Sequence, residues 1–220
     1  IAPKVIGNTS KRGSIVSFKP KLGILTDVTW RYELFAEHLN NTASQLPGVH
    51  VYLIDERTDR KDDFYYENGI KEYLERKNQN NKALTPILHF KETVGGNTIE
   101  FAFQYLDQFY EERFYSFANT VFTPDEGTHV RGFRIGFNKA INEYGEEANY
   151  IKKGQKIEQA DIQEGLTGIL SVMIKEEELH FIGQTKGKLG TASIQNPVAN
   201  FVYEKVYYFL KENKSFAKAI

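Results

Sequence analysis

Apolar and polar side chains alternate most clearly in two segments, 87–93 and 98–106, which are joined by Gly95-Gly96-Asn97. A period of two is typical of a strand with one face buried, and a short glycine-containing connection joins antiparallel strands. The pattern therefore predicts a β-hairpin whose second strand faces the core. The positions on that inward face are Ile99, Phe101, Phe103 and Tyr105.

Further segments rich in β-branched and aromatic residues are bounded by turn residues, and they are predicted as strands. The glutamates 176–178 are expected to turn the chain so that 179–183 pairs with the strand before them. The predicted strands are 14–18, which precedes Pro20, then 49–55 and 63–67 on either side of a charged loop at 56–62, and finally 113–119 and 166–175.

Apolar residues recur at helical spacing in four other segments, which predicts amphipathic helices. The first would be capped by Thr26 or Asp27 and would end near Gln45. Helices interleaved with mostly antiparallel strands indicate an α+β fold, and without an internal repeat we expect one compact domain. The four predicted helices cover about 30–45, 69–78, 128–143 and 193–212.

Composition excludes several classes of function. The chain has 220 residues, a formal net charge of −1 and no cysteine, so disulfides, thiolate nucleophiles and cysteine zinc sites are absent. A near-neutral charge disfavours a protein that coats nucleic acid, because such proteins are strongly basic. The five histidines show no metal-ligand spacing, and each is interpreted as a surface or packed residue.

One segment carries candidate chemistry, the loop from Phe181 to Gly190, which holds three glycines and two lysines. Glycines allow a backbone to approach a ligand closely, and a loop lysine supplies a point charge suited to a terminal phosphate. On composition alone, a flexible solvated loop explains this segment better than an anion site does. The P-loop, the G-x-S-x-G elbow and the H-E-x-x-H zinc helix are absent from the sequence.

Several blocks of the chain, in order along the sequence, are similar to known motifs. They are Gly13–Pro20 with G-T-x-[IV]-x-F-x-P, Tyr66–Ile70 with Y-E-G-G-I, Gly127–Arg134 with G-T-H-x-x-G-F-[RK], Asn142 near the end of the predicted helix, Glu164–Val172 with E-G-L-x-x-[VI]-x-S-V, and Gly183–Leu189 with a Q-T-K loop. Together these blocks resemble the B subunits of bacterial type IIA DNA topoisomerases, the gyrase and topoisomerase IV subunits. Glu126 and Asn68 depart from the family pattern, because glycine is usual at both positions.

The resemblance implies that residues 1–212 are a transducer domain and that 213–220 begin a linker. The nucleotide-binding domain would precede residue 1, and the metal-binding, DNA-cleaving TOPRIM domain would follow residue 220. The implied fold is a four-stranded sheet backed by helices, with a left-handed β-α-β crossover. The implied site residues are Lys186, as a catalytic charge, and Gln184, both contacting the γ-phosphate of ATP.

The resemblance also implies a cytoplasmic isomerase that uses ATP with magnesium, the magnesium being held outside this chain. Its partners would be DNA, an A-type subunit and a second copy of the B-type chain joined through the ATPase domain, with no membrane. The isolated chain is expected to bind no cofactor and to be inactive. Two alternatives stay open: a non-catalytic nucleic-acid-binding module on the same fold, and the transducer of another GHKL ATPase, such as a mismatch-repair protein or a chaperone.

Overall fold

The computed structural model describes residues 4–10, 12–19, 23, 29–107 and 110–219. Two compact units are present, Ile1–Tyr32 and Glu33–Ile220. In the first unit the predicted strand at 14–18 is wrong, because these residues pair with no strand among the described residues and the side chains of Ile15 and Val16 are exposed. The predicted caps Thr26 and Asp27 lie outside the described residues.

Helix α1 (Tyr32–Ser44) starts at the last residue of the first unit, and the second unit continues with the antiparallel hairpin of β1 (Val51–Asp55) and β2 (Arg60–Phe64). The strand predicted at 63–67 therefore starts three residues too late. Arg57 closes a tight turn by donating hydrogen bonds to the Asp55 carboxylate from its backbone N–H (3.0 Å), its Nε (2.9 Å) and its Nη2 (2.7 Å). Asp59, later in the same turn, adopts a φ of 56°. The charged residues that follow are thus strand residues and not part of a loop.

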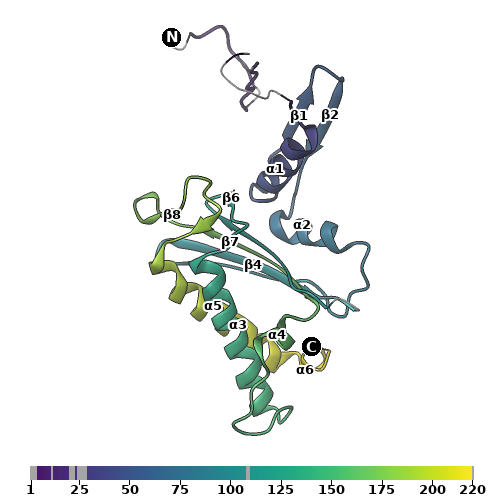
Figure 1. The fold of residues 1–220 in the computed structure, drawn as a ribbon, viewed down its shortest axis with the longest axis vertical. Helices are drawn as coiled ribbons and strands as arrows, with labels where there is room; N and C mark the ends of the chain where they lie inside the picture. Colours follow the sequence, from purple (N-terminus) through teal and green to yellow (C-terminus); the bar gives the residue numbers. More distant parts are fainter. Residues whose placement is uncertain (1–3, 11, 20–22, 24–28, 108–109, 220) are drawn as a thin grey trace. The chain divides into compact units, whose positions relative to one another are not determined.

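The central sheet has the order β3-β4-β7-β5-β6, and Figure 1 shows its long strands lying side by side. The predicted hairpin is confirmed within a residue at each end, and the sheet is mostly antiparallel, with β5 parallel to β7. The two-residue β6 was not predicted and makes the sheet five-stranded. The strands are β3 (Leu88–Val94), β4 (Asn97–Tyr105), β5 (Arg113–Ala118), β6 (Val121–Phe122) and β7 (Leu166–Met173).

One face of the sheet is covered by α3 (Thr128–Glu147) and α5 (Gln195–Glu212), which run together in Figure 1. Phe101 and Phe103 from β4 meet Phe133 and Phe137 from α3 at ring-centroid distances of 5.7 and 5.0 Å. The other face carries α2 (Gly69–Asn78), whose apolar side packs against Ala102, Phe117 and Ile169. The α+β class is therefore confirmed, with a mixed sheet between helices.

Two glycines set the close approach of α3 to α5. A Cβ added at Gly136 would lie 2.2 Å from the carbonyl oxygen of Ala199, and one added at Gly132 would lie 2.4 Å from that of Gln195. Real Cβ atoms do not approach oxygen so closely, so these positions need glycine for the backbones to touch. The two helices consequently behave as one packed pair under the sheet.

The predicted pairing of 179–183 with β7 is wrong. Both edges of β7 are already occupied, by β4 and β5, so β8 (Phe181–Ile182) pairs instead with β9 (Lys188–Leu189). Two short helices were also missed, α4 (Gln159–Gln163) and α6 (Lys214–Ala217). The segment assigned to the start of a linker thus contains a helix, and its Phe216 is buried 5.1 Å from the ring of Phe209.

Candidate functional site

The loop that carries Gln184 and Lys186 closes the small β8–β9 hairpin. Ile182 pairs with Lys188, and the N–H of Gly190 donates to the carbonyl of His180 (2.8 Å). Gly183 has a φ of 83° and Lys186 a φ of 55°. A lysine in the left-handed region is uncommon and carries a backbone strain, so the surrounding contacts must hold this conformation.

The polar side chains of the loop face solvent while its backbone is held. Gln184, Thr185, Lys186 and Lys188 are exposed, whereas Leu189 is fully buried. The Nζ of Lys186 lies 5.8 Å from the centroid of the Phe181 ring, at the outer limit of a cation–π contact. Both predicted site residues therefore sit on one exposed turn, with an amide and an ammonium group available to a ligand.

Two backbone hydrogen bonds join this loop to the segment that precedes α3. The N–H of Asp125 donates to the carbonyl of Gly187 (2.9 Å), and the N–H of Leu189 donates to that of Glu126 (2.9 Å). Gly127 lies so close that a Cβ there would be 2.2 Å from the oxygen of Leu189. The G-T-H and Q-T-K blocks, well separated in the sequence, are thus neighbours in the fold.

Two threonines complete the attachment of the loop to α3. The hydroxyl of Thr128 donates to the carbonyl of Thr191 (2.7 Å). The hydroxyl of Thr191 accepts from the N–H of His180 (2.8 Å) and donates to the carbonyl of Glu178 (3.0 Å). The first residue of α3 and both arms of the β8–β9 hairpin are therefore linked through buried or half-buried hydrogen bonds.

An ion-pair cluster lies beside the same segment. Arg134 donates to both carboxylate oxygens of Glu126 and to one oxygen of Glu112, each at 2.7 Å. Burial would lower the pKa of Arg134, but its hydrogen bonds to the two carboxylates outweigh burial and raise that pKa. The motif resemblance includes Arg134 only as part of the G-T-H block, and nothing in the sequence indicates that Glu112 joins it.

His129 is buried, in agreement with its interpretation as a packed histidine, and its Nε2 lies 3.2 Å from the hydroxyl of Thr123. Burial lowers its pKa to about 3, so the ring is neutral. His50 contacts Asp63 and His89 contacts Glu100. Within the described part of the chain, no group of three or more His, Asp or Glu residues could hold a metal ion.

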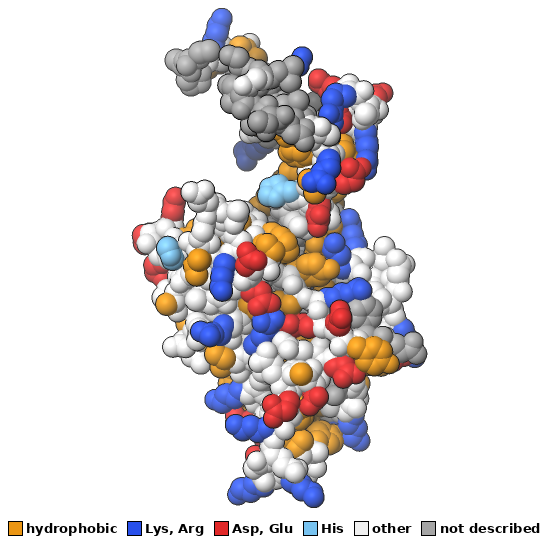
Figure 2. All heavy atoms as spheres, in the orientation of Figure 1, with side chains coloured by type: hydrophobic (Ala, Val, Ile, Leu, Met, Phe, Trp, Pro, Cys, Tyr) orange, Lys and Arg blue, Asp and Glu red, His pale blue; other side chains and the backbone are white. Residues whose placement is uncertain are grey.

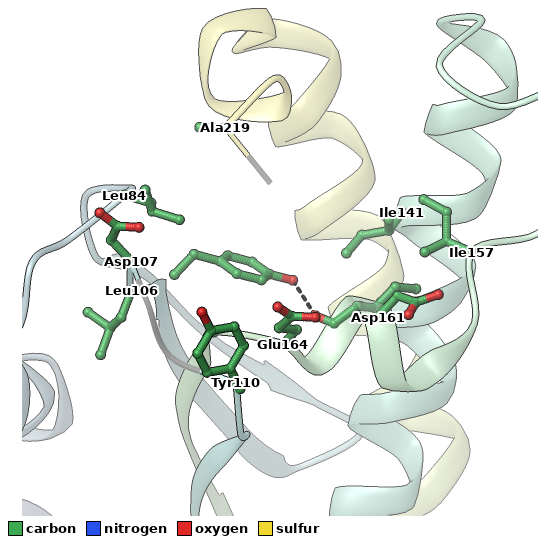
Figure 3. A pocket seen from close by; sticks show the side chains of 12 residues that line it. Leu84, Leu106, Asp107, Tyr110, Ile141, Ile157, Asp161, Glu164 and Ala219 are labelled. Carbon is green, nitrogen blue, oxygen red and sulfur yellow. Dashed lines mark hydrogen bonds between the residues drawn. The ribbon is translucent and has the colours of Figure 1, made fainter.

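A cavity of about 400 Å³ lies elsewhere, between the end of β4, α4 and Ala219 (Figure 3). The hydroxyl of Tyr105 donates to the carbonyl of Ile162 (2.7 Å) on its wall. The carboxylates of Asp107, Asp161 and Glu164 line it, which makes it unsuitable for an anionic phosphate. None of its lining residues belongs to the β8–β9 loop.

Charged side chains on the visible face of the second unit are mixed in sign (Figure 2). Blue and red groups alternate there, without a continuous basic stripe on this face of the described residues. No helix in the described part of the chain combines the length and the apolar character needed to cross a bilayer.

Residues 69–220 match the family model of DNA gyrase B. The chain belongs to the DNA gyrase B family. It is 40% identical over 213 residues to the B subunit of DNA topoisomerase 4 from Bacillus subtilis, and 36% identical over 225 residues to the B subunit of DNA gyrase from Thermotoga maritima. These alignments cover 96% and 99% of the chain, which spans about a third of each relative (32% and 35%).

The fold is similar to a solved member of the family. The crystal structure of the 43K ATPase domain of Thermus thermophilus gyrase B, in complex with an aminocoumarin, superposes with a TM-score of 0.74. The two chains are 25% identical, and the match covers 92% of this chain and 54% of that one. The family model begins at Gly69, the first residue of α2, so the central sheet and the loop both lie inside the matched region.

Proposed function

We propose that this chain contains the transducer of an ATP-dependent type IIA topoisomerase of the gyrase B type, in which the loop of Gln184 and Lys186 senses the γ-phosphate of ATP. The observation that carries the proposal is the pairing of the two motif blocks. An exposed amide and an exposed ammonium group sit on one strained turn, and the residues that follow this turn are hydrogen-bonded to the segment that starts α3. Membership of the DNA gyrase B family supports it.

The chemistry of the two side chains fits a terminal phosphate. Lys186 supplies a positive charge that stabilises the charge developing on the γ-phosphate during transfer to water, and Gln184 donates a hydrogen bond to the same group. ATP with magnesium would be bound by the preceding domain of the intact subunit. The loop then supplies a charge across the domain boundary, and we expect the isolated chain to bind neither nucleotide nor metal.

The attachment of the loop offers a route for the signal. Release of phosphate removes the attraction between nucleotide and loop, and any displacement of the loop pulls on Glu126 and Asp125 through the backbone hydrogen bonds. Those residues lead directly into α3. In the intact enzyme this motion would be coupled to DNA passage, with an A-type subunit and a second copy of the B-type chain as partners.

We further infer that the β5–α3–β7 unit, whose strands are parallel, contains the left-handed crossover.

Substitution of two neighbouring lysines tests this function. In the intact subunit, Lys186→Ala should lower ATP turnover by roughly 10²–10³-fold, or about 3–4 kcal/mol, the scale of losing one preorganised charge at a transition state. Lys188→Ala removes an equal charge two residues away and should cost much less. Steady-state ATPase rates, with thermal melts as a folding control, give the comparison. Equal losses, or an unchanged rate in Lys186→Ala, would disprove the proposed role.

A further inference from the structure

Glu126 adopts a backbone conformation that normally favours glycine. Its φ is 60°, and its N–H donates to the carbonyl of Thr123 (2.9 Å), which closes a turn with Pro124 at the second position. Proline presets the φ of that position, but the left-handed residue that ends the turn is strained when it carries a Cβ. A residue with a Cβ pays that strain, so this chain must hold Glu126 in place by other contacts.

The side chain of Glu126 provides those contacts. Both of its oxygens accept from Arg134, whose guanidinium also reaches Glu112 just before β5. The side chains of Arg134, Glu112 and Glu126 are 24%, 15% and 37% exposed, so the cluster is largely shielded from water. A shielded bidentate pair fixes geometry more than it adds stability, because desolvation offsets much of the attraction.

Glu126 also holds the loop in place, through its backbone. Its carbonyl accepts the N–H of Leu189 at 2.9 Å, and its neighbour Asp125 donates to the carbonyl of Gly187 at 2.9 Å. Lys186 is separated from both of these bonds by three residues or fewer. The orientation of the Glu126 peptide group therefore decides where the turn with Lys186 is held.

We propose that Arg134, clamped between Glu112 and Glu126, is a positioning residue for the loop that carries Lys186. The ion pair keeps Glu126 at its positive φ, and the Glu126 carbonyl then stays aimed at Leu189. This inference rests on the proposed function of the loop. In this chain, the ion pairs of Arg134 hold residue 126 at a positive φ that a glycine would adopt without strain.

The sharpest test compares alanine with glycine at one position in the intact subunit. Both Glu126→Ala and Glu126→Gly remove the ion pair and leave Arg134 with Glu112. Alanine keeps the strain at positive φ, whereas glycine removes it. Glu126→Ala should therefore lower kcat about five- to tenfold with KM changed less than about twofold, and Glu126→Gly should stay within about twofold of wild type.

A second set of variants removes the cation. Arg134→Gln combined with Glu112→Gln removes the cation together with the more buried of its two carboxylates and leaves only the partly exposed Glu126 carboxylate, and it should reproduce the loss seen in Glu126→Ala. Adding Glu126→Gly to this pair should restore kcat to within about twofold of wild type. Lys139→Gln serves as the matched control, because Lys139 lies on the same helix with its Nζ over the ring of Tyr203 (4.2 Å).

Hydrogen exchange of the Leu189 amide gives a readout independent of ATP. Exchange should become about five- to tenfold faster in Glu126→Ala and in the Arg134 pair, and should return to near the wild-type rate when glycine occupies 126. Equal behaviour of alanine and glycine at 126, or no rescue of the Arg134 pair, would overturn the positioning role. If Lys186→Ala leaves ATPase unchanged, the proposed function fails, and Leu189 exchange still decides the positioning role.

Discussion

Replacement of Gly127 by alanine should disrupt the contact on which the proposed site depends. A Cβ at this position would lie 2.2, 2.7 and 2.9 Å from the carbonyl oxygen, nitrogen and carbonyl carbon of Leu189. All three are backbone atoms, so no side chain can turn aside to make room. The φ of 139° adds a conformational cost, since residues with a Cβ rarely adopt it.

The expected loss of stability in Gly127→Ala follows from these two effects. Relief of the overlap requires β9 to move by about 1 Å, which breaks the hydrogen bond from Leu189 to Glu126 at a cost of about 1 kcal/mol. Backbone strain at the positive φ adds about 1–3 kcal/mol. We expect the free energy of unfolding to fall by about 2–4 kcal/mol and ATP turnover of the intact subunit to fall by about 10²-fold, because a displacement of 1 Å misplaces Lys186.

Gly154→Ala is the matched control. Gly154 also has a positive φ, 81°, but a Cβ there would meet nothing within 4 Å. It should lose about 1 kcal/mol of stability from the conformational term alone and keep full ATPase activity. Chemical denaturation of this chain and steady-state ATPase of the intact subunit measure both quantities. If the two alanine variants behave alike, close packing of Gly127 on Leu189 does not hold the loop.

Two further predictions concern His129 and the isolated chain. Because burial depresses the pKa of His129 from 6.5 to about 3, the unfolded chain binds a proton between these values and the folded chain does not. The contribution of His129 to the free energy of unfolding is therefore fully present above pH 6.5, and below this pH it falls by about 1.4 kcal/mol per pH unit. If His129→Gln shows the same pH dependence of stability as wild type between pH 7 and 5, this prediction is wrong. The isolated chain should hydrolyse no ATP, since the proposed loop contributes one charge contact and no nucleotide pocket, and turnover that persists through further purification would refute it.

The parts of the fold that the sequence predicts well have strong local signals. The β3–β4 hairpin follows from largely alternating apolar and polar residues around a glycine turn, and α2 is predicted with both of its ends correct. The start of β2 is missed because Arg60, Lys61 and Asp62 have loop-like composition. Pairing with β1 overrides that preference, since one face of a two-stranded hairpin remains in water.

Other features depend on the tertiary structure and could not be predicted from local patterns. The partner of β8 depends on which edges of the sheet are free, and only the strand order shows that β7 has none. Composition alone favours a solvated loop at 184–190, and the resemblance of two motif blocks identifies it as a candidate site. The hydrogen bonds from Asp125 and to Glu126 join backbone groups about sixty residues apart, so no spacing rule could indicate them.

The attachment of the loop determines which element can respond to it. β9 is bonded to β8 on one side and to residues 125–127 on the other, so β9 and the start of α3 must move together. Within the hairpin, the turn from Gly183 to Lys186 is the exposed part with left-handed residues at both ends. If this turn follows the γ-phosphate as proposed, small motions are absorbed there. Larger motions pass to α3, and the backbone contacts at Gly132 and Gly136 carry them to α5, because close-packed helices shift as a unit and do not deform.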